Sequence, residues 1–141
     1  MQKFIGMVIF IRLWHQDLIS YLPRQQLLGQ HRECCGMRGK GWGQNHATVN
    51  YVWEYSIERL IAFHLLVMKE MEDRGFNVTQ KWFDKQYRGK KLAHDESIDK
   101  DKVNELFNKK PIYPEHDDEY LKECINNLAQ KGIDIKMEWL K

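Results

Sequence analysis

The sequence contains little cysteine and no long hydrophobic run, and its charges nearly balance. Three of the 141 residues are cysteine, and two of them, Cys34 and Cys35, are adjacent. This count argues against a secreted disulfide framework and favours the reducing cytosol, so we expect a cytoplasmic protein. The longest apolar run, residues 4–11, is far shorter than the roughly 20 residues that a membrane-spanning helix needs. The run is also followed by no small-residue cleavage site of a signal peptide.

The rest of the composition fits one small globular domain. Hydrophobic residues make up 43% of the chain and charged residues 30%, which is too much core-forming material for a disordered chain. We therefore expect an apolar N-terminal extension over residues 1–11, followed by a single domain over residues 12–141. Residues 4–11 also fit a buried strand-like or loop segment.

The charges are unevenly distributed, although the net charge is only +2. Residues 1–91 carry 14 Lys and Arg against 8 Asp and Glu, whereas residues 92–141 carry 8 against 12. All seven arginines lie between Arg12 and Arg88. A polyanionic partner should therefore contact the first two-thirds of the chain.

Hydrophobic periodicity and helix boundary residues predict four helices. The predicted helices span residues 23–38, 57–74, 99–109 and 115–131. Pro23 suits a first helical position, and Gly75 and Gly132 suit helix ends. Residues 39–50 are rich in glycine but lack the Gly-Lys-Ser/Thr ending of a phosphate-binding P-loop. The expected fold class is mainly α, a single compact helical domain with long irregular loops.

Residue patterns for metal or serine chemistry are weak. His31, Cys34 and Cys35 lie on the apolar side of the first helix, but no second Cys/His cluster completes the four ligands of a structural zinc site. We interpret them as core residues and expect no metal and no other cofactor. The chain also lacks the His-Glu-x-x-His spacing of zinc proteases and the Gly-x-Ser-x-Gly sequence of serine hydrolases.

An adjacent Arg-Glu pair on the polar side of the first helix carries a family resemblance. Residues 18–34 read Leu-Ile-Ser-Tyr-Leu-Pro-Arg-Gln-Gln-Leu-Leu-Gly-Gln-His-Arg-Glu-Cys, with the pair at Arg32 and Glu33. Residues 46–51 begin His-Ala-Thr, and the next long helix ends in Arg-Gly-Phe-Asn at 74–77. Taken alone, the pair also fits an exposed ion pair of little energetic consequence. Together, the order and separation of these segments resemble the pyrimidine-dimer DNA glycosylases of the phage endonuclease V type.

The resemblance covers about residues 12–95 and implies a bifunctional DNA repair enzyme. Such an enzyme cuts the glycosidic bond of a cyclobutane pyrimidine dimer and then acts as a lyase and endonuclease, nicking the strand at the abasic sugar. Its nucleophile is the α-amine of the processed N-terminus, which forms an imine with C1′. That position falls here at about Arg12, with eleven residues ahead of it. Glu33 would stabilise positive charge on the sugar and assist proton abstraction, and Arg32 would hold the phosphate beside the lesion.

Further DNA contacts and two alternative functions follow from the same sequence. Phosphate contacts are expected from Arg24, Arg38 and Lys40, and base contacts from Trp42 and His46. Lys40 is also a second candidate for the nucleophilic amine, and Trp42 also fits a loop anchor packed on the core. The expected partner is damaged double-stranded DNA, bound by a monomer. The alternatives are a non-catalytic nucleic-acid-binding module of the same fold and a protein-interaction domain that docks its acidic C-terminal helix.

Overall fold

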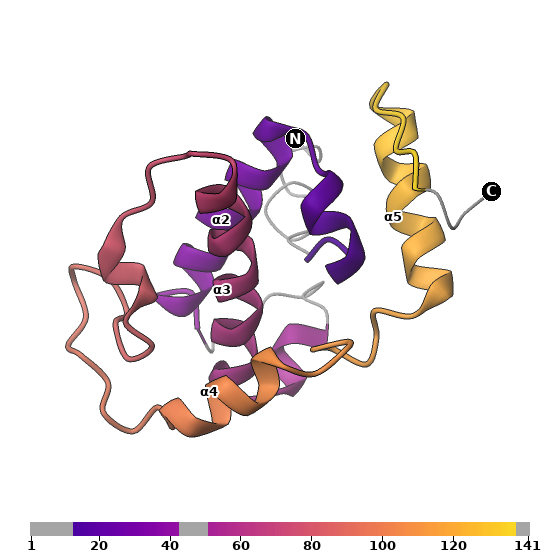
Figure 1. Cartoon of the computed structure of the whole chain (residues 1–141). Coiled ribbons are helices and arrows are strands. Elements are labelled where there is room, and N and C mark those ends of the chain that lie inside the picture. The colour runs from indigo at the N-terminus through magenta and orange to yellow at the C-terminus, as the bar shows by residue number, and fades with distance from the viewer. Residues whose placement is uncertain (1–12, 43–50, 138–141) are drawn as a thin grey trace, which may run out of the picture.

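A computed structural model of the chain describes residues 13–42 and 51–137, and all regular structure within them is helical (Figure 1). The predicted helices are α2 (Arg24–Arg38), α3 (Ile57–Asp73), α4 (Lys100–Phe107) and α5 (Asp118–Gln130). The structure adds three short 3₁₀ helices, η1 (Gln16–Tyr21), η2 (Tyr51–Glu54) and η3 (Gln80–Phe83). The expectation of a mainly α fold is confirmed. None of the helices in the described ranges is long and apolar enough to cross a membrane.

The helix boundaries follow local hydrogen-bonding chemistry. Pro23 is the N-cap of α2 and not its first helical residue. The carboxylates of Asp99 and Asp117 accept backbone N–H groups of the first turns of α4 and α5. Because Asp117 is the cap, α5 begins three residues after the predicted start at 115. Gly75 and Gly132, which both have positive φ, lie just beyond the ends of α3 and α5.

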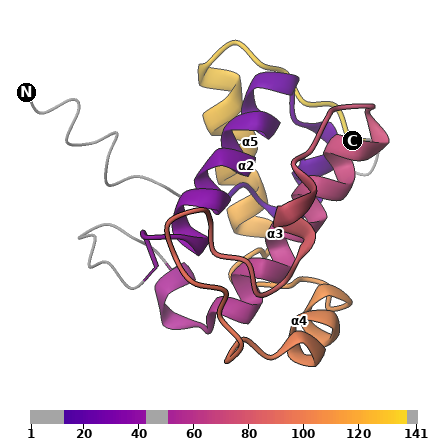
Figure 2. The same ribbon diagram turned by 90° about the vertical axis from the view of Figure 1, so that its left-hand side faces the viewer.

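Helix α3 is the central element of the fold. It packs against α2, α4 and η1, and Figures 1 and 2 show α2 and α4 beside it, whereas Figure 1 shows α5 farther away, beyond the N-terminal segment. Its buried residues are Leu60, Ile61, Ala62, Phe63, His64, Val67, Met68 and Met71. They join one hydrophobic cluster whose members run from Leu13 to Met137. Helix α2 is thus held on the core by its buried side and presents its other side to solvent.

Arg38, at the end of α2, is buried inside the fold. Its guanidinium donates to the backbone carbonyls of Trp82 at 2.9 Å, Asp84 at 3.0 Å and Tyr87 at 3.2 Å. It also lies over the Trp82 ring, 5.0 Å from the centroid. The side chain is 0% exposed, so it has no surface left for a phosphate. Arg38 therefore holds residues 82–87, which follow α3, against the end of α2. The sequence had suggested a DNA contact for this residue instead.

Residues 116–120, just before and within the first turn of α5, contact residues 13–16 at the start of η1. The Tyr120 hydroxyl donates to the carbonyl of Leu13, and Nδ1 of His116 accepts the backbone N–H of Gln16 at 2.9 Å. The ring of His15 stacks on that of His116 with centroids 5.2 Å apart. The first described residues are thereby held against the start of α5.

Candidate active site

Glu33 lies on α2 at the border between its buried and exposed sides. Its carboxylate is half-buried, and its Oε1 accepts a hydrogen bond from Nε2 of Gln30 at 2.9 Å. The amide oxygen of Gln30 in turn accepts the backbone N–H of Trp14 at 2.6 Å. A chain of two hydrogen bonds therefore connects the carboxylate to the segment that precedes η1.

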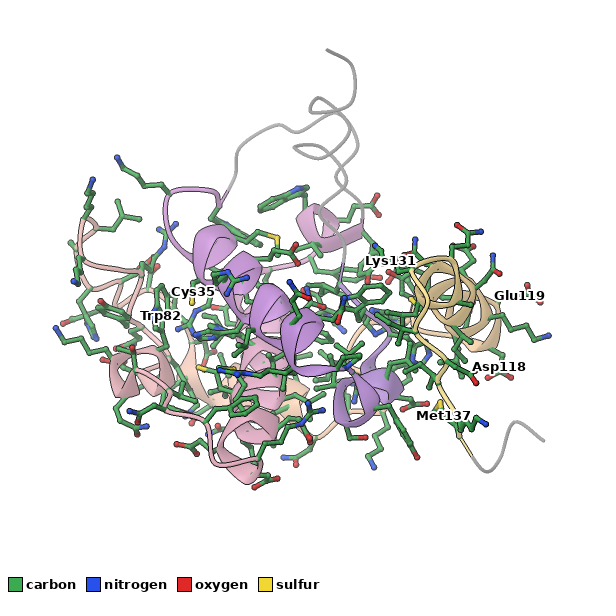
Figure 3. The ribbon with its side chains drawn as sticks, turned by 90° about the horizontal axis from the view of Figure 1, so that it is seen from above. Cys35, Trp82, Asp118, Glu119, Lys131 and Met137 are labelled. Atoms are coloured by element: carbon green, nitrogen blue, oxygen red, sulfur yellow. The ribbon has the colours of Figure 1, made fainter. Side chains whose placement is uncertain are left out.

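The environment of Glu33 combines desolvation with nearby positive charge. Burial raises the pKa of Glu33 above its ordinary value, and the Gln30 hydrogen bond and the charges of Arg32 and Lys131 oppose this rise. Lys131 lies just beyond the end of α5, on the side that faces α2 (Figure 3), and its ammonium is 5.9 Å from the ring centroid of Trp14. A carboxylate of raised pKa is a stronger base than an exposed one, so Glu33 is suited to accept a proton.

Two glycines leave part of α2 bare beside Glu33. Side-chain directions in an α-helix advance by about 100° per residue, which places Gly29 and Gly36 between the directions of Glu33 and Arg32. A Cβ atom at either glycine would meet nothing within 4 Å. An interior glycine costs a helix about 1 kcal/mol relative to alanine. We call the surface of α2 at Gly29 and Gly36, between Glu33 and Arg32, the bare strip. A ligand can approach the helix backbone there, between a carboxylate and a guanidinium.

The structure brings only some of the expected site residues together. Arg32 is exposed beside Glu33, and Lys40 is exposed just beyond the end of α2. Arg24 is exposed too, but it precedes Glu33 by nine residues and therefore projects from the opposite side of α2. Arg12 and His46 lie outside the described residues.

Trp42 is half-buried at the end of the first described range. Its ring packs on that of Trp53 with centroids 5.0 Å apart. Trp53 belongs to η2, so the contact joins the chain after α2 to the chain before α3. This packing fits the loop anchor that the sequence offered as the second interpretation of Trp42.

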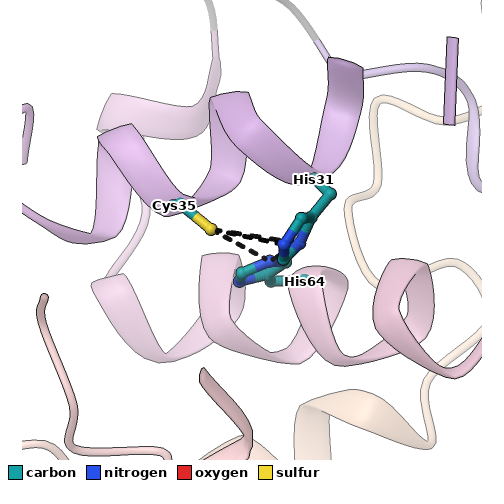
Figure 4. Close-up of side chains that lie close together, drawn as sticks. All are labelled: His31, Cys35 and His64. Carbon is teal, nitrogen blue, oxygen red and sulfur yellow. Dashed lines mark hydrogen bonds between the residues drawn. The ribbon is translucent and has the colours of Figure 1, made fainter. Parts of the chain in front are cut away.

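His31, Cys35 and His64 form a cluster between α2 and α3 (Figure 4). Nδ1 of His31 lies 2.9 Å from Nε2 of His64, and Sγ of Cys35 lies 3.8 Å and 3.9 Å from the two nitrogens of His31. The sequence pattern grouped His31 with both neighbouring cysteines, and it missed His64 because that residue comes from another helix. Cys34 is instead fully buried in the hydrophobic core.

The hydrogen bonds around His64 fit a chain from Arg38 through His64 to His31 better than they fit a bound metal cation. Arg38 lies 3.0 Å from Nδ1 of His64 and can only donate, so Nδ1 is the acceptor and the proton of the neutral ring is on Nε2. That N–H then points at His31, where a metal ligand would need a lone pair. A divalent cation would also lie close to the buried guanidinium of Arg38. The expectation that no metal is required stays a prediction.

One of three comparisons with known proteins gives a match. A family model described as pyrimidine dimer DNA glycosylase matches residues 11–84, which are 74 of the 141 residues. The matched part contains α2, α3 and the Arg32–Glu33 pair beside the bare strip. Searches of curated proteins and of solved structures give no match. The chain therefore belongs to the pyrimidine dimer DNA glycosylase family, whose substrate is damaged DNA.

Proposed function

We propose that this protein cuts the glycosidic bond of a pyrimidine dimer or a related lesion in duplex DNA and then nicks the strand at the resulting abasic sugar, using an amine nucleophile and Glu33. The observation that carries the proposal is the position of Glu33. Its half-buried carboxylate borders the bare strip, and Gln30 connects it to the chain segment that follows position 12. A strand whose sugar lies at Glu33 would place a phosphate within reach of Arg32.

The chemistry follows from an amine and one carboxylate. The amine nitrogen bonds to C1′ as the glycosidic bond breaks, and the base leaves with the bonding electrons and a proton. The C1′–O4′ bond then breaks and O4′ takes up a proton from water, so the sugar ring opens and C1′ and the amine nitrogen form a protonated imine. This imine makes the hydrogen on C2′ acidic. Glu33 accepts that proton, and the C3′–O bond breaks, so the strand is nicked. Water then hydrolyses the imine and frees the amine.

The amine has three candidates in this chain. An α-amine has a pKa of about 7.7–8.0, so a useful fraction is nucleophilic at neutral pH, and a chain processed to begin at Arg12 would supply one. Lys40 is an exposed lysine next to α2. The structure adds Lys131, whose charge acts on Glu33 and whose ammonium lies over Trp14. Each candidate amine predicts a covalent protein–DNA adduct at a different position in the chain.

Borohydride trapping tests the imine directly. We expect the native protein, incubated with a duplex that carries one abasic site and then reduced, to form a covalent protein–DNA adduct. Mass spectrometry of the digested adduct identifies the amine, and Lys40→Met and Lys131→Met test the two lysines. The same duplex without the abasic site is the control. Salt-sensitive duplex binding with no adduct would contradict the proposal and support the non-catalytic binding module.

Replacing Gly29 with alanine tests whether the bare strip receives DNA. The new methyl group enters open space in a helix interior, so the free energy of unfolding in urea should rise by about 0.5–1 kcal/mol. The same methyl group narrows the strip, so we expect weaker binding of abasic duplex in a fluorescence anisotropy titration.

The matched control for this variant is Asn126→Ala on the exposed side of α5. It also improves helix propensity, and it lies on a helix that contributes nothing to the bare strip. We expect it to stabilise the fold and to leave DNA affinity unchanged. If Gly29→Ala binds abasic duplex as tightly as the control does, the bare strip does not receive DNA.

A further inference from the structure

Gln30 is a buried polar residue in the middle of α2 that joins two parts of the site. Its side chain is 1% exposed. The amide oxygen accepts the N–H of Trp14, and the amide nitrogen donates to the carboxylate of Glu33. A peptide N–H can only donate and a carboxylate can only accept, so these two partners fix the orientation of the amide.

One hydrogen bond acts on the Glu33 carboxylate and the other on the backbone N–H of Trp14. Donation to Oε1 restricts the Glu33 side chain at the edge of the bare strip. By holding the backbone at Trp14, Gln30 keeps the chain at Trp14 close to the Glu33 carboxylate.

We propose that Gln30 is a positioning residue for strand cleavage, which orients the Glu33 carboxylate and holds the chain at Trp14 beside it. This inference rests on the function proposed above for Glu33. Packing alone would not call for an amide, because methionine has similar length and fills core space without polar atoms to satisfy. A buried amide is retained at little cost only when both of its ends are hydrogen-bonded, as they are here.

The first test replaces Gln30 with methionine. The variant keeps the side-chain length and loses both hydrogen bonds. We expect kcat for nicking of an abasic duplex to fall about tenfold, which is the size of one lost hydrogen bond to a charged group, while KM changes less than about twofold. Gln80→Met, at an exposed position of η3, is the matched control and should leave both constants unchanged.

The second test uses the conservative variant Gln30→Glu and its dependence on pH. A neutral carboxyl can accept from Trp14 and donate to Glu33, as the amide does, whereas an ionised one cannot donate and repels Glu33. Two adjacent carboxyls share a proton, and this raises the pKa of the pair. Arg32 and Lys131 are the charged groups that oppose this rise. We expect the kcat of the variant, divided by that of the wild type, to recover as the pH falls from 8 to 6.

The outcomes separate this inference from the function on which it rests. Wild-type kcat in Gln30→Met, or a ratio for Gln30→Glu that does not change with pH, would overturn the positioning role and leave the proposed function standing. If Gln30→Met fails to fold, as judged by circular dichroism, the pH profile of Gln30→Glu decides alone. A wild-type protein that neither nicks nor traps abasic DNA would remove the proposed function itself.

Discussion

Replacing Glu33 with glutamine is expected to lower the rate of strand nicking on abasic or UV-irradiated duplex by about 100- to 10,000-fold. Glutamine keeps the shape of the side chain and can still hydrogen-bond Gln30, but it cannot accept the C2′ proton or stabilise positive charge on the sugar. The rate is measured under single-turnover conditions, so that product release does not hide the chemical step.

Duplex binding should separate this loss from a loss of affinity. Removal of a carboxylate from a surface that receives phosphates lowers electrostatic repulsion, so Glu33→Gln should bind abasic duplex as tightly as the wild type or more tightly. Glu105→Gln, at an exposed position of α4, removes the same charge far along the chain and should nick normally. Equal nicking by Glu33→Gln and Glu105→Gln would exclude Glu33 as the proton acceptor.

The helical architecture could be predicted from the sequence because its signals are local. Apolar residues recur at helical spacing in α2 and α3, and glycines stand at the ends of α3 and α5. The start of α5 was misplaced because Asp117, and not an earlier acidic residue, provides the cap. The short helices η1, η2 and η3 carry no such periodicity, since they are too short to complete a repeat.

The candidate site could be predicted only in part, because its polar contacts join residues far apart in the chain. The Arg32–Glu33 pair was recognised through its place in a family pattern. No sequence pattern singled out Gln30, which is buried and accepts a hydrogen bond from Trp14 of the N-terminal segment. Arg38 read as a surface cation, although the backbone carbonyls that surround it lie 44 to 49 residues away. No local pattern marks such partners.

Lowering the pH from 7.5 to 5 is expected to cost the fold about 2 kcal/mol through His116 alone, a roughly 30-fold change in the folding equilibrium. Burial lowers the pKa of His116 to about 3, from an ordinary value of 6.5. His116 therefore binds a proton below pH 6.5 in the unfolded chain, whereas in the folded protein it binds one only near pH 3. The stability is fully present above pH 6.5 and is lost as the pH falls from there toward 3. Urea unfolding at each pH measures it.

His116→Gln isolates this contribution, because glutamine can accept from the Gln16 N–H and donate to the Tyr51 hydroxyl without titrating in this range. Burial also lowers the pKa values of His15 and His64, so the variant should still lose stability in acid, but by about 2 kcal/mol less than the wild type. Glu33 acts in the opposite direction, since its raised pKa favours the folded state as it protonates. Comparing the pH slopes of the two proteins cancels these shared terms. Equal slopes would mean that His116 takes up its proton without disturbing the contact between α5 and the N-terminal segment.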